Sequence, residues 1–396
     1  MVKIKAFKAI RPTRDKVSLV ASRSYLTYSE ETIREKLDHN PYTFLHIINP
    51  EYKLKDKKKG LEKFQKIRNK FNEFIKKGIF INENKNSLYI YQQSNDLNTF
   101  TGIIGAVAIK DYLDGNIKKH EETLKKRKEM FCNYLKITGF NAEPVLLSYQ
   151  KNKSIDKIIK KYVAKRAEYE FTTTNKSLHK LWVITDEKDI RDTSNAFKDI
   201  DKLYIADGHH RTASSALLSK LNKSKENNYF MSYLIDEKQL RVLSFNRLIK
   251  SLNGLKPGDF INKIKENFKV KEKKSPYSPI QKNEICMYLE KKWYSLILKN
   301  DANNLDPTIL SLNILKPILN IIDERIDKNI SFINGKTPLS SIKQIVDNEI
   351  YKVAFILKPI TINNIKNVAD KGESLPPKST YVEPKLRSGL TIYRTK

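Results

Sequence analysis

Five consecutive residues that could do chemistry stand near the middle of the chain: Asp207, Gly208, His209, His210 and Arg211. Imidazole exchanges protons near neutral pH, and the guanidinium fork matches the oxygens of a phosphate or a carboxylate. The apolar run before these residues predicts a strand, and the small and apolar residues after them predict a helix. A strand that turns through glycine into a helix directs backbone N–H groups and the positive end of the helix dipole toward one point. The pattern therefore predicts an anion-binding turn.

The turn has the residues for phosphoryl transfer or for metal binding. In phosphoryl transfer, backbone amides and Arg211 would hold phosphate oxygens, and His209, His210 or Asp207 would exchange a proton with the reacting hydroxyl. The same acid and histidines are potential metal ligands, but successive helical residues point about 100° apart, which disfavours a structural zinc site. A magnesium ion that bridges a carboxylate to a nucleotide is compatible with the turn. The alternative without function is a helix capped by Asp207 with its histidines in solvent.

Three acidic or basic residues near expected helix starts are further candidates. Glu30 falls in the first turn of a helix, where the dipole favours a carboxylate, so it is either a stabilising residue or a catalytic base. His120 and Glu121 are expected at the start of a basic helix over residues 117–128. They could hold a proton or a metal ion, and a solvated helix start accounts for them equally well.

A loop near the C-terminus presents several hydrogen-bond donors. The proline pair at residues 376–377 keeps the backbone extended and stiff. The side chains that follow are Lys378, Ser379, Thr380 and, further along, Lys385. We expect this loop to return to the turn and to bind a second phosphate or a substrate carboxylate. A stiffened surface loop with no such role is the alternative.

The amino-acid composition limits the kinds of molecule that the protein is expected to bind. The 396-residue chain has a formal net charge of +30, from 75 Lys and Arg against 45 Asp and Glu. Its lysines are spread over most expected helices instead of forming one stripe, which disfavours nucleic acid and fits a basic surface that attracts small anions. No apolar run approaches the roughly 18 residues that span a membrane, and the N-terminus lacks a signal-peptide core. We expect a cytoplasmic protein with no membrane partner that binds a small anionic metabolite or a nucleotide.

The expected elements indicate a mixed α+β fold in two parts. Residues 1–251 would form the catalytic or nucleotide-binding core, residues 252–258 a linker, and residues 259–396 a C-terminal α+β portion whose tail loop returns to the site. The periodicity also predicts a helix over residues 61–77, strands over 17–21 and 42–48, hairpins over 87–109 and 229–245, and a disordered segment over 271–282.

Six ordered blocks resemble a known bacterial family, the domain of unknown function 1015. The blocks are residues 11–17 (RPTRDKV), 20–25 (VASRSY), 40–50 (NPYTFLHIINP), 119–124 (KHEETL), 206–211 (ADGHHR) and 376–385 (PPKSTYVEPK). The ADGHHR block also looks like the core turn of the ParB/sulfiredoxin-like superfamily, which implies a mixed-sheet core and a phosphate-binding turn. Within these blocks, the resemblance makes Gly208, Arg211, Arg23 and His120 candidates for binding phosphate or substrate.

Free serine kinases of that superfamily use a similar Asp-Gly-His block. The resemblance therefore implies phosphoryl transfer that involves serine or phosphoserine, by a kinase or a phosphatase, with a purine nucleotide and Mg²⁺ as the implied cofactors. The alternative is a ParB-like regulator that binds a nucleotide or nucleic acid without turnover. The scattered lysines and the lack of an evident DNA-reading helix-turn-helix favour the enzyme.

Overall fold

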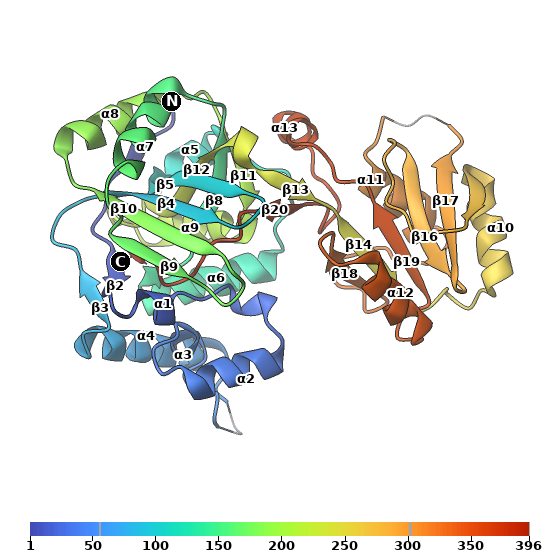
Figure 1. Cartoon of the computed structure of the whole chain (residues 1–396), viewed down its shortest axis with the longest axis horizontal. Coiled ribbons are helices and arrows are strands. Elements are labelled where there is room, and N and C mark those ends of the chain that lie inside the picture. Colours follow the sequence, from blue (N-terminus) through green and yellow to red (C-terminus); the bar gives the residue numbers. More distant parts are fainter. Residues whose placement is uncertain (55–56, 301–302, 396) are drawn as a thin grey trace. The chain divides into compact units, whose positions relative to one another are not determined.

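The computed structural model describes residues 1–54, 57–300 and 303–395, and the chain forms two compact units (Figure 1). Unit 1 comprises Met1–Lys119, Thr123–Leu240 and Pro384–Lys396, and unit 2 comprises His120–Glu122 and Arg241–Glu383. This division differs from the expected one in two places. Residues 241–251 belong to unit 2 because their strands pair there, and the last thirteen residues belong to unit 1.

Unit 1 is built on a mixed sheet that contains nine strands among the described residues, in the order β6-β11-β8-β12-β5-β4-β10-β9, with β1 also paired to β5. Two further strand pairs, β2-β3 and β21-β7, lie outside it. The strands are β1 (Ile4–Lys5), β2 (Ile10–Pro12), β3 (Phe80–Asn82), β4 (Leu88–Ser94), β5 (Thr99–Ala108), β6 (Ile117–Lys118), β7 (Phe140–Asn141), β8 (Val145–Tyr149), β9 (Tyr169–Thr172), β10 (Leu178–Ile184), β11 (Leu203–Asp207), β12 (Tyr229–Asp236) and β21 (Tyr393–Arg394).

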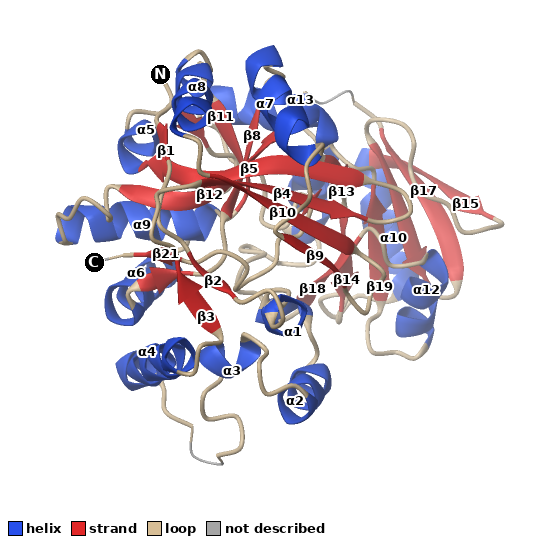
Figure 2. Cartoon of the chain, turned by 60° about the vertical axis from the view of Figure 1, so that its left-hand side comes forward, coloured by secondary structure: helices blue, strands red, loops and turns tan. Residues whose placement is uncertain are grey.

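The helices of unit 1 cover the sheet in two groups. They are α1 (Val17–Val20), α2 (Glu30–His39), α3 (Leu45–Ile48), α4 (Gly60–Lys76), α5 (Ile109–Leu113), α6 (Lys125–Thr138), α7 (Lys153–Val163), α8 (Glu187–Lys198) and α9 (His209–Leu221), with 3₁₀ turns at Tyr25–Thr27 and Glu237–Gln239. Helices α7 and α8 pack on one side of the sheet, and α2, α3 and α4 lie on the other (Figures 1 and 2). A second core, rich in phenylalanine, joins α3 and α4 to β3 and β7.

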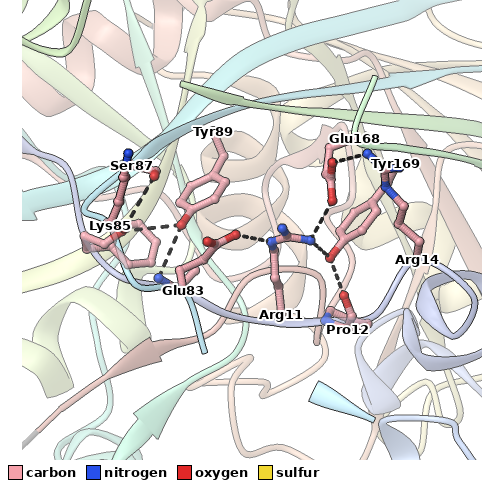
Figure 3. Close-up of polar contacts among 11 residues, drawn as sticks. Arg11, Pro12, Arg14, Glu83, Lys85, Ser87, Tyr89, Glu168 and Tyr169 are labelled. Atoms are coloured by element: carbon pink, nitrogen blue, oxygen red, sulfur yellow. Dashed lines mark hydrogen bonds and ion pairs between the residues drawn. The ribbon is translucent and has the colours of Figure 1, made fainter. Parts of the chain in front are cut away.

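A buried arginine ties three segments of unit 1 together (Figure 3). Arg11 on β2 donates through Nε to Glu83, and its Nη1 lies 3.0 Å from Oε1 of Glu168. The same Nη1 donates to the Tyr169 hydroxyl, which donates in turn to the carbonyl of Pro12. Two carboxylates therefore compensate the charge of Arg11 inside the unit.

Unit 2 is an antiparallel sheet with helices on both faces. Among its described residues the strand order is β15-β17-β16-β19-β14-β18, and β13 pairs separately with β20. Alternate residues of β16 serve two cores, with Ile285 and Met287 in one and Cys286 and Tyr288 in the other. The strands are β13 (Arg241–Leu243), β14 (Phe245–Ile249), β15 (Phe268–Lys273), β16 (Glu284–Leu289), β17 (Lys292–Leu298), β18 (Ile330–Asn334), β19 (Val353–Leu357) and β20 (Tyr381–Glu383). The helices are α10 (Pro257–Asn267), α11 (Asp306–Leu310), a π-helical turn (Ser311–Leu315), α12 (Leu339–Asp347) and α13 (Ile362–Asp370).

The mixed α+β class predicted from the sequence is confirmed, as are the helix over 61–77 and the hairpin over 87–109, which are α4 and β4-β5. Other element predictions were wrong. Residues 17–21 and 42–48 contain the helices α1 and α3, because periodicity does not separate a strand from one helical turn in so short an apolar run. The strand after β12 pairs with β20 and not with β12. The segment expected to be disordered begins within β15.

The basic helix also begins later than predicted. Residues 117–118 form β6 beside β11, and helix α6 starts at Lys125. His120 and Glu121 therefore precede the helix and do not cap it. None of the helices in the described part of the chain is long and apolar enough to cross a membrane.

Candidate active site

The Asp-Gly-His-His-Arg turn has the local structure that the sequence predicts. Strand β11 ends at Asp207, Gly208 turns the chain with φ +107°, and α9 begins at His209. The helix start packs closely, because a Cβ atom at Gly208 would lie only 3.1 Å from Cζ of Arg211. Glycine is needed here both for the backbone conformation and for the approach of the guanidinium.

Arg211 bridges two acidic residues. Its Nη2 lies 3.1 Å from Oδ2 of Asp207, and its Nη1 lies 3.1 Å from Oε1 of Glu143. Nη1 also donates to the carbonyl of Pro144. Glu143 lies here because β8 runs antiparallel to β11, with Leu146 opposite Asp207, so that β8 begins where β11 ends.

Glu143 escaped the sequence analysis. It stands 64 positions before Asp207, and only the pairing of two strands brings the two together. No sequence pattern identifies such a residue. Only the order of the strands in the sheet could have shown that Glu143 lies beside Asp207.

The C-terminal tail completes this cluster. Lys385 places its Nζ 3.6 Å from Oδ1 of Asp207, opposite the side that Arg211 contacts through Oδ2. Ser388 donates from Oγ to Oε2 of Glu143 at 3.2 Å. The tail is held by β21, which pairs with β7, and by the bond from the N–H of Gly389 to the carbonyl of Ala142. Two carboxylates and two cations thus meet at the start of α9.

The two histidines of the turn have different surroundings. His209 is 6% exposed, and burial lowers its pKa to about 3, with the nearby charge of Asp207 only partly opposing that effect. Burial therefore disfavours the charged form of His209, and its expected role in proton exchange stays a prediction. His210 is only half-buried, so the proton-exchange role stays a prediction for His210.

A cavity of about 360 Å³ adjoins the turn within unit 1. Its walls come from α3, α4, α6 and the segment that precedes β8, and they are mostly apolar, with Phe44, Phe64 and Tyr134 among them. Its polar lining residues include Glu143, Arg211 and Ser214. Arg211 therefore belongs both to the wall of this cavity and to the ion-pair cluster at the turn.

The remaining candidates lie apart from this cluster. Glu30 is exposed in the first turn of α2, where Ser29 caps the helix by accepting from the N–H of Thr32. Arg23 lines a second cavity of unit 1. The described residues include no hydrogen bond or ion pair from Glu30 or Arg23 side chains to the turn.

Five predicted residues belong to unit 2. His120 is buried and its Nε2 lies 3.4 Å from Oγ1 of Thr380. Ser379 donates to the carbonyl of Pro376 at 2.6 Å, and the exposed Lys378 places its Nζ 5.3 Å from the centre of the Phe245 ring. Glu121 is half-buried beside His120 in the sequence. The closure of the turn by Lys378, Ser379 and Thr380 stays a prediction.

The part of the chain that the structure describes contains no group of three or more His, Cys, Asp or Glu side chains disposed to hold a metal ion. Asp207 and Glu143 form a smaller oxygen-donor pair, and both contact Arg211.

The model of the family described as protein of unknown function (DUF1015) matches residues 4–323. The chain therefore belongs to this family, as the sequence blocks predicted, although the sixth block, residues 376–385, lies outside the matched range. Comparison with curated proteins finds no match.

Several solved structures are similar to this chain, among them the following three. One is a free serine kinase in complex with AMP, with 15% identity, 74% of this chain and 91% of that chain covered, and a TM-score of 0.42. A conserved hypothetical protein from Pyrococcus furiosus is 16% identical, with 72% of this chain and 91% of that chain covered, and has a TM-score of 0.39. SbnI with a C-terminal truncation, from Staphylococcus aureus, is 12% identical, with 72% of this chain and 85% of that chain covered, and has a TM-score of 0.41.

Proposed function

We propose that this protein is a phosphoryl-transfer enzyme, a kinase or a phosphatase, that acts on a small hydroxy amino acid such as serine or phosphoserine. The observation that carries the proposal is that Arg211 belongs to two features of unit 1 at once. Its side chain lines the apolar cavity and also contacts Asp207 at the start of α9. A ligand that fills the cavity and carries a phosphate at its end would therefore meet a carboxylate, a helix N-terminus and two cations.

The cavity has the properties of a nucleotide pocket. Its volume falls within the ~300–1,000 Å³ common for small-molecule sites, and its apolar and aromatic walls suit a base and a ribose. Lys59 and Lys63 of the α4 region line it as well, which adds positive charge for phosphates. The Arg211 guanidinium has five N–H donors. In the described part of the chain only Nη1 and Nη2 meet acceptors, so Nε–H can donate to a ligand.

Asp207 is the residue placed to handle the proton. Its carboxylate is 41% exposed, so a substrate hydroxyl can reach it, and Arg211 and Lys385 hold it from two sides. In the kinase direction the hydroxyl oxygen bonds to the terminal phosphorus, the bond from that phosphorus to the bridging oxygen breaks, and Asp207 takes the hydroxyl proton. His210 is the second candidate for this proton.

Magnesium suits the donors present, since Asp207 and Glu143 offer the carboxylate oxygens that Mg²⁺ takes alongside nucleotide phosphates. When bound, the ion would supply positive charge against the transferred phosphoryl group. Within the chain itself, Arg211 and Lys385 supply that charge.

The choice of substrate rests on the resemblance of the Asp-Gly-His block to that of free serine kinases. Serine offers the hydroxyl that the proposed chemistry needs, and phosphoserine offers the reverse reaction.

Phosphorus NMR tests the proposal directly. The protein is incubated with Mg²⁺, ATP or ADP, and serine or phosphoserine, and the spectrum is followed for phosphoserine or free phosphate. We expect transfer by the wild type and at least about 100-fold slower transfer by Asp207→Asn. Phe64→Ala should weaken nucleotide binding, whereas Leu61→Ala, an exposed residue of the same helix outside the cavity, should not. Nucleotide binding without turnover of any of these substrates would instead favour the regulatory alternative.

A further inference from the structure

Unit 1 contains a second cavity, of about 560 Å³, on the other side of the tail from the first. The backbones of Ser22 and Ser388 form a two-bond antiparallel bridge. Ser24 and Ser388 line the first cavity, and Arg23 and Arg387 line the second. Its other walls come from α1, α2 and the turn that joins β9 to β10. The two cavities are thus separate sites within one unit.

Arg387 is a buried cation without a carboxylate partner. The residue is 7% exposed, and its Nη2 donates to Oγ1 of Thr173 at 3.0 Å and to Oδ1 of Asn175 at 2.8 Å. Both acceptors are neutral. Across residues 1–54, 57–300 and 303–395, no Asp or Glu forms an ion pair with Arg387 or with Arg23. A guanidinium stays charged at any ordinary pH, so this charge remains uncompensated.

Further positive charge faces the same cavity. Arg23 lies half-buried in its wall. Burial lowers the pKa of the Arg387 guanidinium, Tyr91 and Tyr28 oppose that effect, and the charge of Arg23 adds a smaller lowering. Lys36 of α2 also lines the cavity, with its Nζ 5.4 Å from the centre of the Tyr28 ring. No acidic side chain is among the lining residues that the structure describes.

A network of neutral side chains holds Arg387. Oγ1 of Thr173, which accepts from Arg387, lies 3.4 Å from Nε2 of His179, and Nδ1 of His179 lies 2.7 Å from the Tyr91 hydroxyl. Burial, with the charges of Arg387 and Arg23, lowers the pKa of His179 to about 3. The histidine therefore stays neutral above about pH 4 and adds no repulsion against the arginines.

Holding two arginines close together without a counter-charge is costly, because burial removes water and like charges repel. An anion in the cavity would remove that cost, and the open cavity leaves room for one. We infer that the cavity at Arg23, Lys36 and Arg387 binds the oxyanion of a small molecule, a carboxylate or a phosphate. Hydroxyl and amide side chains on the remaining walls, including Thr32, Asn40 and Thr43, offer hydrogen bonds to the rest of such a molecule.

Calorimetric titration of the whole chain tests this inference in the absence of nucleotide. The probes are inorganic phosphate, L-serine and O-phospho-L-serine, with glycerol as the uncharged control. Binding of phosphate alone identifies a phosphate site, and binding of serine identifies a carboxylate site. Failure of all three probes to bind would overturn the inference.

Matched variants place the binding in this cavity. We expect Arg387→Leu and Arg23→Gln each to weaken anion binding by about tenfold or more. Arg34→Gln removes the same charge from an exposed position of α2 and should change the affinity less than about twofold. Arg211→Gln alters the turn at the other cavity and should leave anion binding in this cavity intact, which separates this inference from the proposed function. Wild-type affinity in both Arg387→Leu and Arg23→Gln would contradict it, and Arg23→Gln decides alone if Arg387→Leu does not fold.

Discussion

Two arginines buried in unit 1, Arg11 and Arg387, are exposed to nearly the same small extent, 8% and 7%, yet have opposite surroundings. Arg11 contacts two carboxylates and the Tyr169 hydroxyl, whereas Arg387 contacts a hydroxyl and an amide oxygen and faces a second arginine. A compensated charge joins elements of the fold, and its removal leaves the partner charges without compensation. An uncompensated charge beside a cavity contributes little to folding and is available for a ligand.

Two other arginines fall between these cases. Arg247 in unit 2 is fully buried and has one carboxylate nearby, with its Nη2 3.6 Å from Oε2 of Glu324. Arg211 has two carboxylate partners, but its side chain is 19% exposed and lines a cavity. It has both structural partners and access to a ligand, the combination that the proposed function requires of this turn.

The largest effect is expected from Arg11→Met. This substitution leaves Glu83 without its guanidinium partner and removes one of the two partners of Glu168, so the free energy of unfolding should fall by about 3–5 kcal/mol. Urea denaturation measures this change, and Lys85→Gln, at an exposed neighbouring position, is the control. A loss no larger than that of the control would show that the compensated pair does not support the fold.

Acid should destabilise the protein through His179 and His209. Burial lowers the pKa of each to about 3, below the ordinary 6.5, so the unfolded chain binds a proton first as the pH falls. Each histidine therefore contributes stability that is complete above pH 6.5 and is lost between pH 6.5 and 3, by up to about 1.4 kcal/mol per pH unit. Denaturation at several pH values measures how the free energy of unfolding depends on pH. We expect this dependence to be shallower in His179→Gln than in the wild type and unchanged in His39→Gln.

Gly208→Ala should destabilise the protein by about 1–3 kcal/mol, because alanine is strained at φ +107° and its Cβ would crowd Arg211. The displaced guanidinium should also weaken nucleotide binding. Thermal denaturation and calorimetry check the two effects. Gly254→Ala, which is strained in the same way but has open space around its Cβ in unit 2, is the control that isolates the contact with Arg211. Equal effects on nucleotide binding from both substitutions would contradict the role of that contact.

The smallest effect on folding is expected from Arg387→Leu. Removing an uncompensated buried cation should change the free energy of unfolding by less than about 1 kcal/mol, or raise it. The pKa of His179 should rise, since one of the charges that lower it is gone, but it should stay below 6.5 because burial is the larger cause. Imidazole NMR measures this pKa. An unchanged pKa together with a loss of stability as large as that of Arg11→Met would remove the distinction between the two arginines.

The sequence predicted the turn well because its determinants are local. An apolar strand, a glycine and a helix of small residues specify β11, Gly208 and α9 without reference to the rest of the chain. The long amphipathic helix α4 and the hairpin β4-β5 were predictable for the same reason. Short elements such as α1 and α3 were not, because one turn of helix and a short buried strand have the same apolar pattern.

The acidic partner Glu143 could not be predicted, because it reaches Arg211 only through the pairing of β8 with β11. The sequence did lead us to expect Lys385 near the turn, but not its contact with Asp207 or the pairing of the tail with β7. The burial of His209, which lowers the pKa of its imidazole, is likewise a property of the packed unit and has no local signal in the sequence.

Calorimetric titration with AMP and with adenosine tests the central claim, that Arg211 joins an apolar cavity to a phosphate-binding turn. Both ligands offer the same base and ribose to the cavity, and only AMP offers a phosphate to Arg211. We predict that AMP binds at one site and at least about tenfold more tightly than adenosine, and that Arg211→Gln removes the difference. Equal affinity of the wild type for the two ligands, or no binding of either, would contradict the claim.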